Sequence, residues 1–122
     1  MPSRKQSPRT RRVADRIQVE LAEILSTRTE DPRLRVLSVT GAEVSRDFSL
    51  AKVWVAGTLL TPDSEPNVLQ ALARATPYFR SLLAARLGLR IVPELQFQID
   101  RSIEKGARIE QLLREIQEPP DE

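Results

Sequence analysis

The segment LSVTGAEVSRDFSLAKVWV, residues 37–55, decides the fold class of this chain. Apolar residues alternate with polar ones over residues 34–44, but the alternation changes parity at Gly41. A strand whose inward face changes parity needs one extra residue, and glycine tolerates such a bulge easily. The alternation resumes over residues 51–55. The segment therefore predicts a β-hairpin with a β-bulge at Gly41 and a loop at residues 45–49.

A helix is predicted before this hairpin. Ser7 is a good N-cap and Pro8 suits a first helical position, because the N–H that proline lacks has no helical partner there. Apolar residues recur every three or four positions from residue 13 to residue 25. The pattern predicts a helix over residues 8–27, which ends before Asp31-Pro32.

A second helical pattern follows the hairpin and runs through residues 68–83. Pro77 lies inside it, has no N–H to donate and pushes the preceding residue away from the helical region. We therefore expect a break or kink at residues 75–77, with Thr76 capping the second half and Gly88 ending the helix.

The last elements are a strand at residues 94–99 and an amphipathic helix from Ile109 to Ile116. The order is α-β-β-α-kink-α-β with a C-terminal helix, which is an α+β domain. The helical crossover implies that the second and third strands are parallel. We expect a three-stranded mixed sheet with the helices packed on one face and the opposite face open.

Composition limits the possible chemistry. The 122 residues suffice for one domain, and the chain has neither cysteine nor histidine. Disulfides, the usual zinc ligands and the usual general bases are thus excluded, and no cofactor or metal is expected. Glu94 and Asp100 are the only carboxylates that could be argued into a pair, and we interpret both as ordinary wet-face residues. The sequence does not predict an enzyme.

The chain has no hydrophobic signal core and no apolar run of about 18 residues, so a cytoplasmic protein without membrane or small-molecule partners is expected. Residues 1–12 contain five basic side chains and no acidic one. A basic arm of this kind is typical of nucleic-acid binding, although a solubilising tail is an equal alternative.

Four strings in order carry a family resemblance: residues 12–21, 31–34, 43–53 and 106–109. Together they resemble the ribosome-binding factor A family over about residues 9–117. The resemblance implies a single type II KH-like domain that binds the free small (30S) ribosomal subunit and assists late maturation of its 16S rRNA. It also implies a monomer that is not an enzyme.

The resemblance sets the expected domain organisation. Residues 1–8 would be a flexible basic arm, residues 9–117 the KH-like RNA-binding domain, and residues 118–122 a flexible acidic tail. Ordinary KH domains clamp RNA with a GXXG loop between two helices. Members of this family are similar in having an Ala-x-Gly kink instead, but this chain has Pro77 where glycine is usual.

The candidate RNA contacts are basic residues at turns and helix ends. They are Arg9, Arg11, Arg12, Arg46, Lys52, Arg74, Arg80, Arg101, Lys105 and Arg108. Arginine forks suit phosphate binding. The alternative is that these are solvated charges, with Asp47, Asp100 and Glu104 as neutralising neighbours.

Trp54 supports a different function. It falls on the sheet face opposite Val53 and Val55, where it could stack on a base but more commonly would cover the outer face or bind a partner protein. The second hypothesis is therefore a protein-interaction module, with a homodimer or partner surface on the open sheet face.

Overall fold

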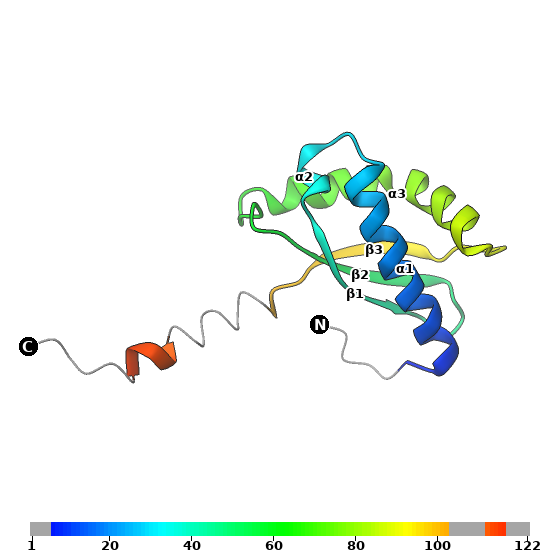
Figure 1. Cartoon of the computed structure of the whole chain (residues 1–122), viewed down its shortest axis with the longest axis horizontal. Helices are drawn as coiled ribbons and strands as arrows, with labels where there is room; N and C mark the ends of the chain where they lie inside the picture. Colours follow the sequence, from blue (N-terminus) through cyan, green and yellow to red (C-terminus); the bar gives the residue numbers. More distant parts are fainter. Residues whose placement is uncertain (1–5, 103–111, 117–122) are drawn as a thin grey trace, which may run out of the picture.

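The computed structural model describes residues 6–102 and 112–116 (Figure 1). Its helices and strands, in chain order, are α1 (Pro8–Thr27), α2 (Pro32–Arg35), β1 (Ser38–Val44), β2 (Leu50–Ala56), α3 (Glu65–Leu87) and β3 (Glu94–Ile99). Residues 112–116 are also helical, within the predicted C-terminal helix. The α+β class is confirmed.

The three strands form one mixed sheet in the order β1-β2-β3. β1 and β2 are antiparallel, whereas β2 and β3 are parallel, as the helical crossover predicts. The register shifts between Val39, which faces Val55, and Gly41, which faces Trp54. Thr40 is therefore the extra residue of a β-bulge, and the bulge predicted at Gly41 is confirmed.

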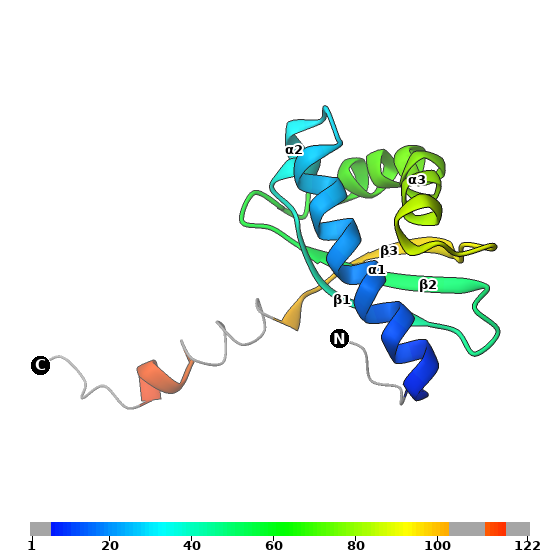
Figure 2. The ribbon, with the colours of Figure 1, turned by 45° about the vertical axis from the view of Figure 1, so that its right-hand side comes forward.

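Both long helices cover the same face of the sheet. α1 lies against β1, and α3 lies against β3 (Figures 1 and 2). The core between them is aliphatic except for Phe79, whose ring meets the Phe97 ring edge-on at 6.0 Å. The fully buried large side chains include Ile17, Leu21, Ile24, Leu25, Val53, Val55, Leu72, Phe79 and Leu83. The predicted helix faces are thus those that form the core.

α1 has the predicted bounds because its N-terminus is capped as expected. The Ser7 hydroxyl oxygen accepts the Thr10 N–H at 3.2 Å, and Pro8 occupies the first turn. This cap satisfies one of the N–H groups that a helix start leaves without a partner. The local sequence therefore determines where α1 begins.

The alternation of apolar residues begins at residue 34, but the first strand does not begin there. Residues 32–35 form the short helix α2, and β1 begins only at Ser38. The Asp31 carboxylate caps α2 by accepting the Arg33 N–H at 2.9 Å, and Pro32 favours a helical first position. Local capping therefore determines that residues 32–35 are helical, in spite of the alternation of apolar residues.

α3 is bent but not broken at Pro77. It is one continuous helix of 23 residues, and Figure 2 shows that its two ends run in different directions. The expectation that Thr76 caps a second helix is wrong. Its hydroxyl donates to the Leu72 carbonyl at 2.9 Å, a bond back to the preceding turn that is known to bend helices. Gly88 ends the helix with φ 63°, as predicted.

The free edge of β1 is covered by two glutamines. The Gln6 side-chain oxygen accepts the Val44 N–H at 2.9 Å, and the Gln18 amide donates to the Val39 carbonyl at 3.3 Å. Both glutamines belong to α1 or the residues just before it. The first helix is thus fastened to the sheet by polar contacts as well as by its buried face.

Candidate nucleic-acid interface

The start of α1 and the hairpin loop 45–49 lie together at one end of the molecule. Gln6 binds the Val44 backbone, and the Arg9 guanidinium lies 5.4 Å from the centre of the Phe48 ring. A cation over an aromatic face is attracted by the ring quadrupole. The first predicted contact, Arg9, is therefore fixed beside the loop that carries Arg46.

A network of hydrogen bonds holds the hairpin loop. The Asp47 carboxylate accepts from the Ser45 hydroxyl at 2.8 Å, the Ser49 hydroxyl at 2.7 Å and the Ser49 N–H at 3.1 Å. These bonds, led by that of the Ser49 hydroxyl, hold the pKa of Asp47 below its ordinary value. The loop is thus locked around an ionised carboxylate.

The same loop contains a strained residue. Phe48 has φ 60°, the left-handed region that a bulky side chain rarely adopts, yet its ring packs against the core. The backbone must therefore be held by its surroundings, which here are the Asp47 network and the contact with Arg9. Arg46, an exposed residue of this loop, is presented from a rigid turn.

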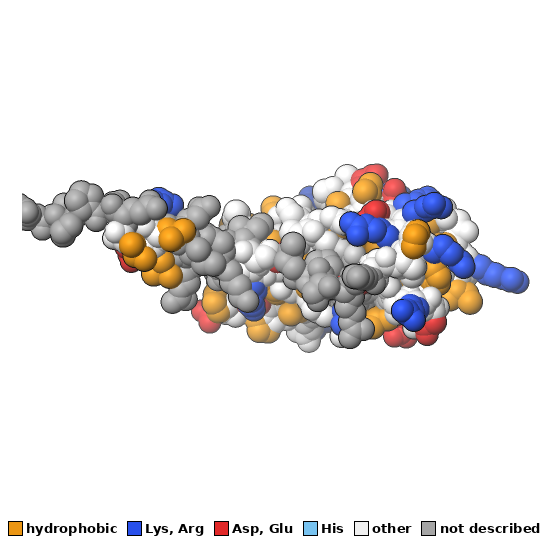
Figure 3. Space-filling model, turned by 90° about the horizontal axis from the view of Figure 1, so that it is seen from below, with side chains coloured by type: hydrophobic (Ala, Val, Ile, Leu, Met, Phe, Trp, Pro, Cys, Tyr) orange, Lys and Arg blue, Asp and Glu red, His pale blue; other side chains and the backbone are white. Residues whose placement is uncertain are grey.

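Basic side chains gather at this end of the molecule (Figure 3). The loop between α3 and β3 also reaches it, because the Glu94 N–H donates to the Ser49 carbonyl at 2.9 Å. We call this region the basic end, and its exposed members are Arg9, Arg11, Arg12, Arg46 and Arg90. Within the described part of the chain, none of these five guanidinium groups has a hydrogen-bond or ion-pair partner, although that of Arg9 contacts the Phe48 ring.

Lys52 lies near the basic end but on the sheet. It is half-buried on the face of β2 opposite the core, between Glu43 on β1 and Gln96 on β3. Its orientation follows from full burial of Ala51 and Val53 on the other face. Lys52 therefore points outward as predicted, with an acidic neighbour across the strands.

Two other predicted contacts bind the protein itself. The Arg80 guanidinium donates to the carbonyls of Val92 at 2.7 Å and Pro93 at 3.1 Å. Arg101 forms an ion pair with Glu65 at 2.8 Å, in which the Glu65 side chain is largely buried. Arg80 thus fastens the loop before β3, and Arg101 joins the end of β3 to the start of α3.

The remaining predicted contacts lie elsewhere. Arg74 is exposed near the bend of α3. Lys105 and Arg108 fall outside the described residues. The structure therefore brings Arg9, Arg11, Arg12 and Arg46 together, with Lys52 close by, and places Arg74, Arg80 and Arg101 in other parts of the fold.

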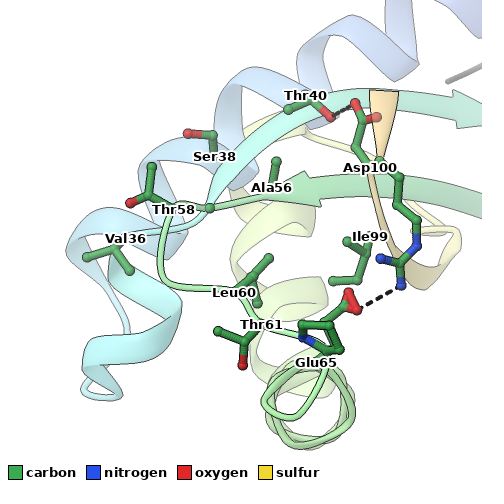
Figure 4. Close-up of a pocket in the computed structure, with 13 residues that line it drawn as sticks. Val36, Ser38, Thr40, Ala56, Thr58, Leu60, Thr61, Glu65, Ile99 and Asp100 are labelled. Carbon is green, nitrogen blue, oxygen red and sulfur yellow. Dashed lines mark hydrogen bonds and ion pairs between the residues drawn. The ribbon is translucent and has the colours of Figure 1, made fainter. Parts of the chain in front are cut away.

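A polar pocket of about 440 Å³ lies where β3 ends (Figure 4). The polar residues of its lining are Ser38, Thr40, Thr58, Thr61, Glu65, Asp100 and Arg101, and apolar residues such as Leu60 and Ile99 complete it. Both carboxylates are already engaged, Glu65 by Arg101 and Asp100 by the Thr40 hydroxyl at 2.6 Å. In the described residues no three acidic side chains come close enough to hold a metal ion. The arrangement anchors the end of β3.

The interpretation of Asp100 as a wet-face residue is wrong. Asp100 is only 6% exposed. Burial raises its pKa, but hydrogen bonds from Thr40 and Ser102 outweigh this effect and hold the pKa below its ordinary value. Strand alternation could not show this, because the bulge at Thr40 turns the partner hydroxyl toward the end of β3.

Trp54 does not form an exposed surface. It lies opposite Val53 and Val55, as predicted, but it is only 9% exposed. Base stacking or partner binding through an open tryptophan is therefore not supported. Among the helices of the described part of the chain, none is long and apolar enough to cross a membrane.

Comparison with known proteins identifies the family. The family model described as ribosome-binding factor A matches residues 9–113. Ribosome-binding factor A of Nitrosomonas eutropha is 42% identical over 107 residues, which are 88% of this chain and 91% of the relative. That of Thiobacillus denitrificans is 43% identical over 109 residues, covering 89% of this chain and 87% of the relative.

Solved structures agree with the fold. The crystal structure of ribosome-binding factor A from Thermus thermophilus is similar with a TM-score of 0.67 and 31% identity, covering 76% of this chain and 97% of that one. A Thermus thermophilus homology model fitted into the cryo-EM map of a 30S complex gives a TM-score of 0.61 and 32% identity, covering 72% and 91%. The chain described here belongs to the ribosome-binding factor A family.

Proposed function

We propose that this protein binds the free 30S ribosomal subunit and assists late maturation of its 16S rRNA without a chemical step of its own. The observation that carries this proposal is the basic end, where exposed arginines surround a locked hairpin loop. Family membership supports it, because a Thermus thermophilus member has been fitted into the map of a complex with the 30S subunit.

The basic end would bind RNA phosphates. Arginine presents a planar fork that pairs with two phosphate oxygens, and phosphate contacts position a protein on RNA without reading its sequence. A rigid loop loses little conformational freedom when it binds, which favours affinity. Arg11, Arg12 and Arg46 are the strongest candidates because their guanidinium groups have no partner within the described residues.

The other predicted contact residues have different proposed roles. Arg80 and Arg101 are engaged inside the protein, so we propose structural roles for both. Lys52 stays in the proposed interface as a half-buried cation, and the exposed Arg74 remains a proposed RNA contact outside the basic end. Lys105 and Arg108 remain predictions of the sequence. We propose a cytoplasmic monomer, since the near-complete burial of Trp54 does not favour a dimer through the outer sheet face.

The test measures binding of purified 30S subunits by gradient co-sedimentation over a series of salt concentrations. Affinity should fall steeply with salt, because each phosphate contact releases counterions and contributes about 0.7 to 0.9 to the log–log slope. Arg12→Gln/Arg46→Gln should weaken binding and lower the slope by about 1.5.

The control variant is Arg35→Gln, which removes the charge of an exposed arginine on α2, away from the basic end. The Arg35 guanidinium donates to the Thr29 carbonyl at 2.6 Å, so thermal unfolding first verifies that this variant is folded. The folded variant should leave the slope unchanged. A wild-type protein that does not bind 30S subunits, or binds them with a flat salt response, contradicts the proposed function.

A further inference from the structure

A second surface with RNA-binding chemistry lies at the bend of α3. The end of α1, α2 and the middle of α3 surround a hollow of about 520 Å³, which is large enough for a nucleotide. We call it the arginine hollow. Its polar and aromatic lining residues are Arg28, Thr29, Glu30, Asp31, Arg33, Arg74, Tyr78 and Phe79. The sequence drew attention only to Arg74.

Two cations of the hollow are available. Arg28 and Arg74 are exposed, and within residues 6–102 and 112–116 their guanidinium groups make no hydrogen bond or ion pair. The third arginine, Arg33, is bound to the Asp31 carboxylate at 2.7 Å. That hydrogen bond holds the pKa of Asp31 below its ordinary value.

The carboxylates of the hollow do not cancel this charge. Asp31 is occupied by Arg33 and also caps α2. Glu30 is the one remaining acid among the lining residues, against two available arginines. The hollow therefore has a net positive charge and would attract an anionic group.

The hollow also offers an aromatic platform. Tyr78 directly follows Pro77 in the middle of α3, and its side chain is 47% exposed. The centre of its ring lies 6.5 Å from that of the buried Phe79 ring, with the two planes tilted by 45°, so the tyrosine lies at the margin of the core. The proline and the bond from the Thr76 hydroxyl to Leu72 set the local helix geometry. A tyrosine held in this way can stack a base at low entropic cost.

The distance from the basic end makes this a separate contact. Arg28 follows the C-terminus of α1, whereas Arg9, Arg11 and Arg12 lie in its first turns. A helix of 20 residues is about 30 Å long. One nucleotide cannot reach both regions, so the arginine hollow would bind a different part of a folded RNA.

We propose that the arginine hollow binds one unstacked nucleotide of single-stranded RNA, with its base on the Tyr78 ring and its flanking phosphates on Arg28 and Arg74. The combination of a half-exposed aromatic ring with two free cations matches the stacking and charge of single-stranded RNA. This site rests on the proposed function, since it assumes that the protein binds RNA.

The experiment uses the full-length protein and two ligands, purified 30S subunits and a fluorescein-labelled single-stranded RNA hexamer of mixed sequence. Tyr78→Ala should weaken hexamer binding about tenfold, because it removes the stacking of one base on the ring. Tyr78→Phe keeps the ring and should bind within about twofold of wild type. Arg74→Gln should weaken binding and lower the salt slope by about 0.7.

Val19→Ala is the matched control, because Val19 is an exposed apolar residue in the middle of α1, outside both the arginine hollow and the basic end. It should bind the hexamer as wild type does. Thermal unfolding verifies that each variant is folded.

The outcomes separate this inference from the proposed function. If wild type binds 30S subunits and Tyr78→Ala binds the hexamer equally well, or wild type has no measurable affinity for the hexamer at low salt, the nucleotide site is wrong and the proposed function stands. Equal losses in Tyr78→Phe and Tyr78→Ala also overturn the stacking role. Failure of wild type to bind 30S subunits contradicts the proposed function itself.

Discussion

The Thr40 hydroxyl donates a 2.6 Å hydrogen bond to the Asp100 carboxylate, across 60 positions of the chain. Thr40 is the extra residue of the β1 bulge, and Asp100 directly follows β3. The bond therefore connects the two edge strands of the sheet at the polar pocket (Figure 4). A bulge that turns one side chain toward a distant partner is a specific feature of a fold, not a defect.

Replacing Asp100 should produce a pH-dependent loss of stability. The folded-state pKa of Asp100 is below its ordinary value of 3.8, so the ionised form stabilises the fold above that pH. This contribution is lost as the pH falls through the folded-state pKa. Asp100→Asn should lower the free energy of unfolding by about 2 kcal/mol at pH 7.

The difference in free energy of unfolding between wild type and Asp100→Asn should shrink as the pH falls below 3.8, as measured by urea unfolding. Thr40→Val should raise the pKa of Asp100, which is measurable by NMR titration. Asp63→Asn changes an exposed aspartate of the loop before α3 and is the control. A pH-independent difference would contradict this role of the carboxylate.

Replacement of Arg80 should reduce stability, whereas replacement of Arg46 should reduce 30S binding. Arg80→Gln removes two charge-assisted hydrogen bonds to the carbonyls of Val92 and Pro93 and should lower the free energy of unfolding by about 2–3 kcal/mol. Arg46→Gln should change it by less than about 0.5 kcal/mol, because the side chain is exposed, yet weaken 30S binding. Urea unfolding and co-sedimentation measure the two effects. Equal effects on stability would show that Arg80 is not a structural residue.

Substitutions of Gly88 should change the stability of the protein through the backbone conformation alone. A Cβ added there meets no heavy atom within 4 Å, but the residue has φ 63°. Gly88→Ala should therefore lower the free energy of unfolding by about 1 kcal/mol, and Gly88→Asn by less, because asparagine adopts this region more easily. Thermal unfolding measures both variants. An alanine variant as stable as wild type would show that α3 can end differently.

Asp47→Ala should weaken 30S binding even though it removes a negative charge. Loss of the carboxylate removes three of the hydrogen bonds that hold Ser45 and Ser49, so the loop is less ordered before it binds, and ordering it costs about 0.5–1.5 kcal/mol per immobilised side chain. The Ser49 amide should exchange its hydrogen faster. Removal of charge alone would strengthen binding to RNA, so tighter binding by Asp47→Ala would contradict a pre-ordered loop.

Local signals predicted most of the fold. Ser7-Pro8 determines the start of α1, Gly41 marks the bulge, and Gly88 ends α3. Each of these depends on a few neighbouring residues whose backbone preferences are strong. The parallel pairing of β2 and β3 followed from the handedness rule for crossovers, which needs only the order of elements.

The interface was harder to predict. Whether an arginine is free to bind RNA or is bound inside the protein depends on contacts with residues that are distant in the sequence. Arg80 and Arg46 look alike in the sequence, and only the fold shows that Arg80 meets the carbonyls before β3. Arg101 likewise finds Glu65, 36 positions away. Tyr78 carried no special signal, since a ring at a helical position is ordinarily expected in a core. The exposed ring became apparent only with the bend of α3.

The two glutamines beside β1 have a consequence for behaviour in a crowded cell. An uncovered outer strand is a template on which another polypeptide can extend a sheet, and such growth leads to aggregates. Gln6 and Gln18 already occupy the Val44 N–H and the Val39 carbonyl on that side. An incoming strand would have to displace both amides before it gained any pairing, so these side chains protect a small, aliphatic protein from assembling with itself.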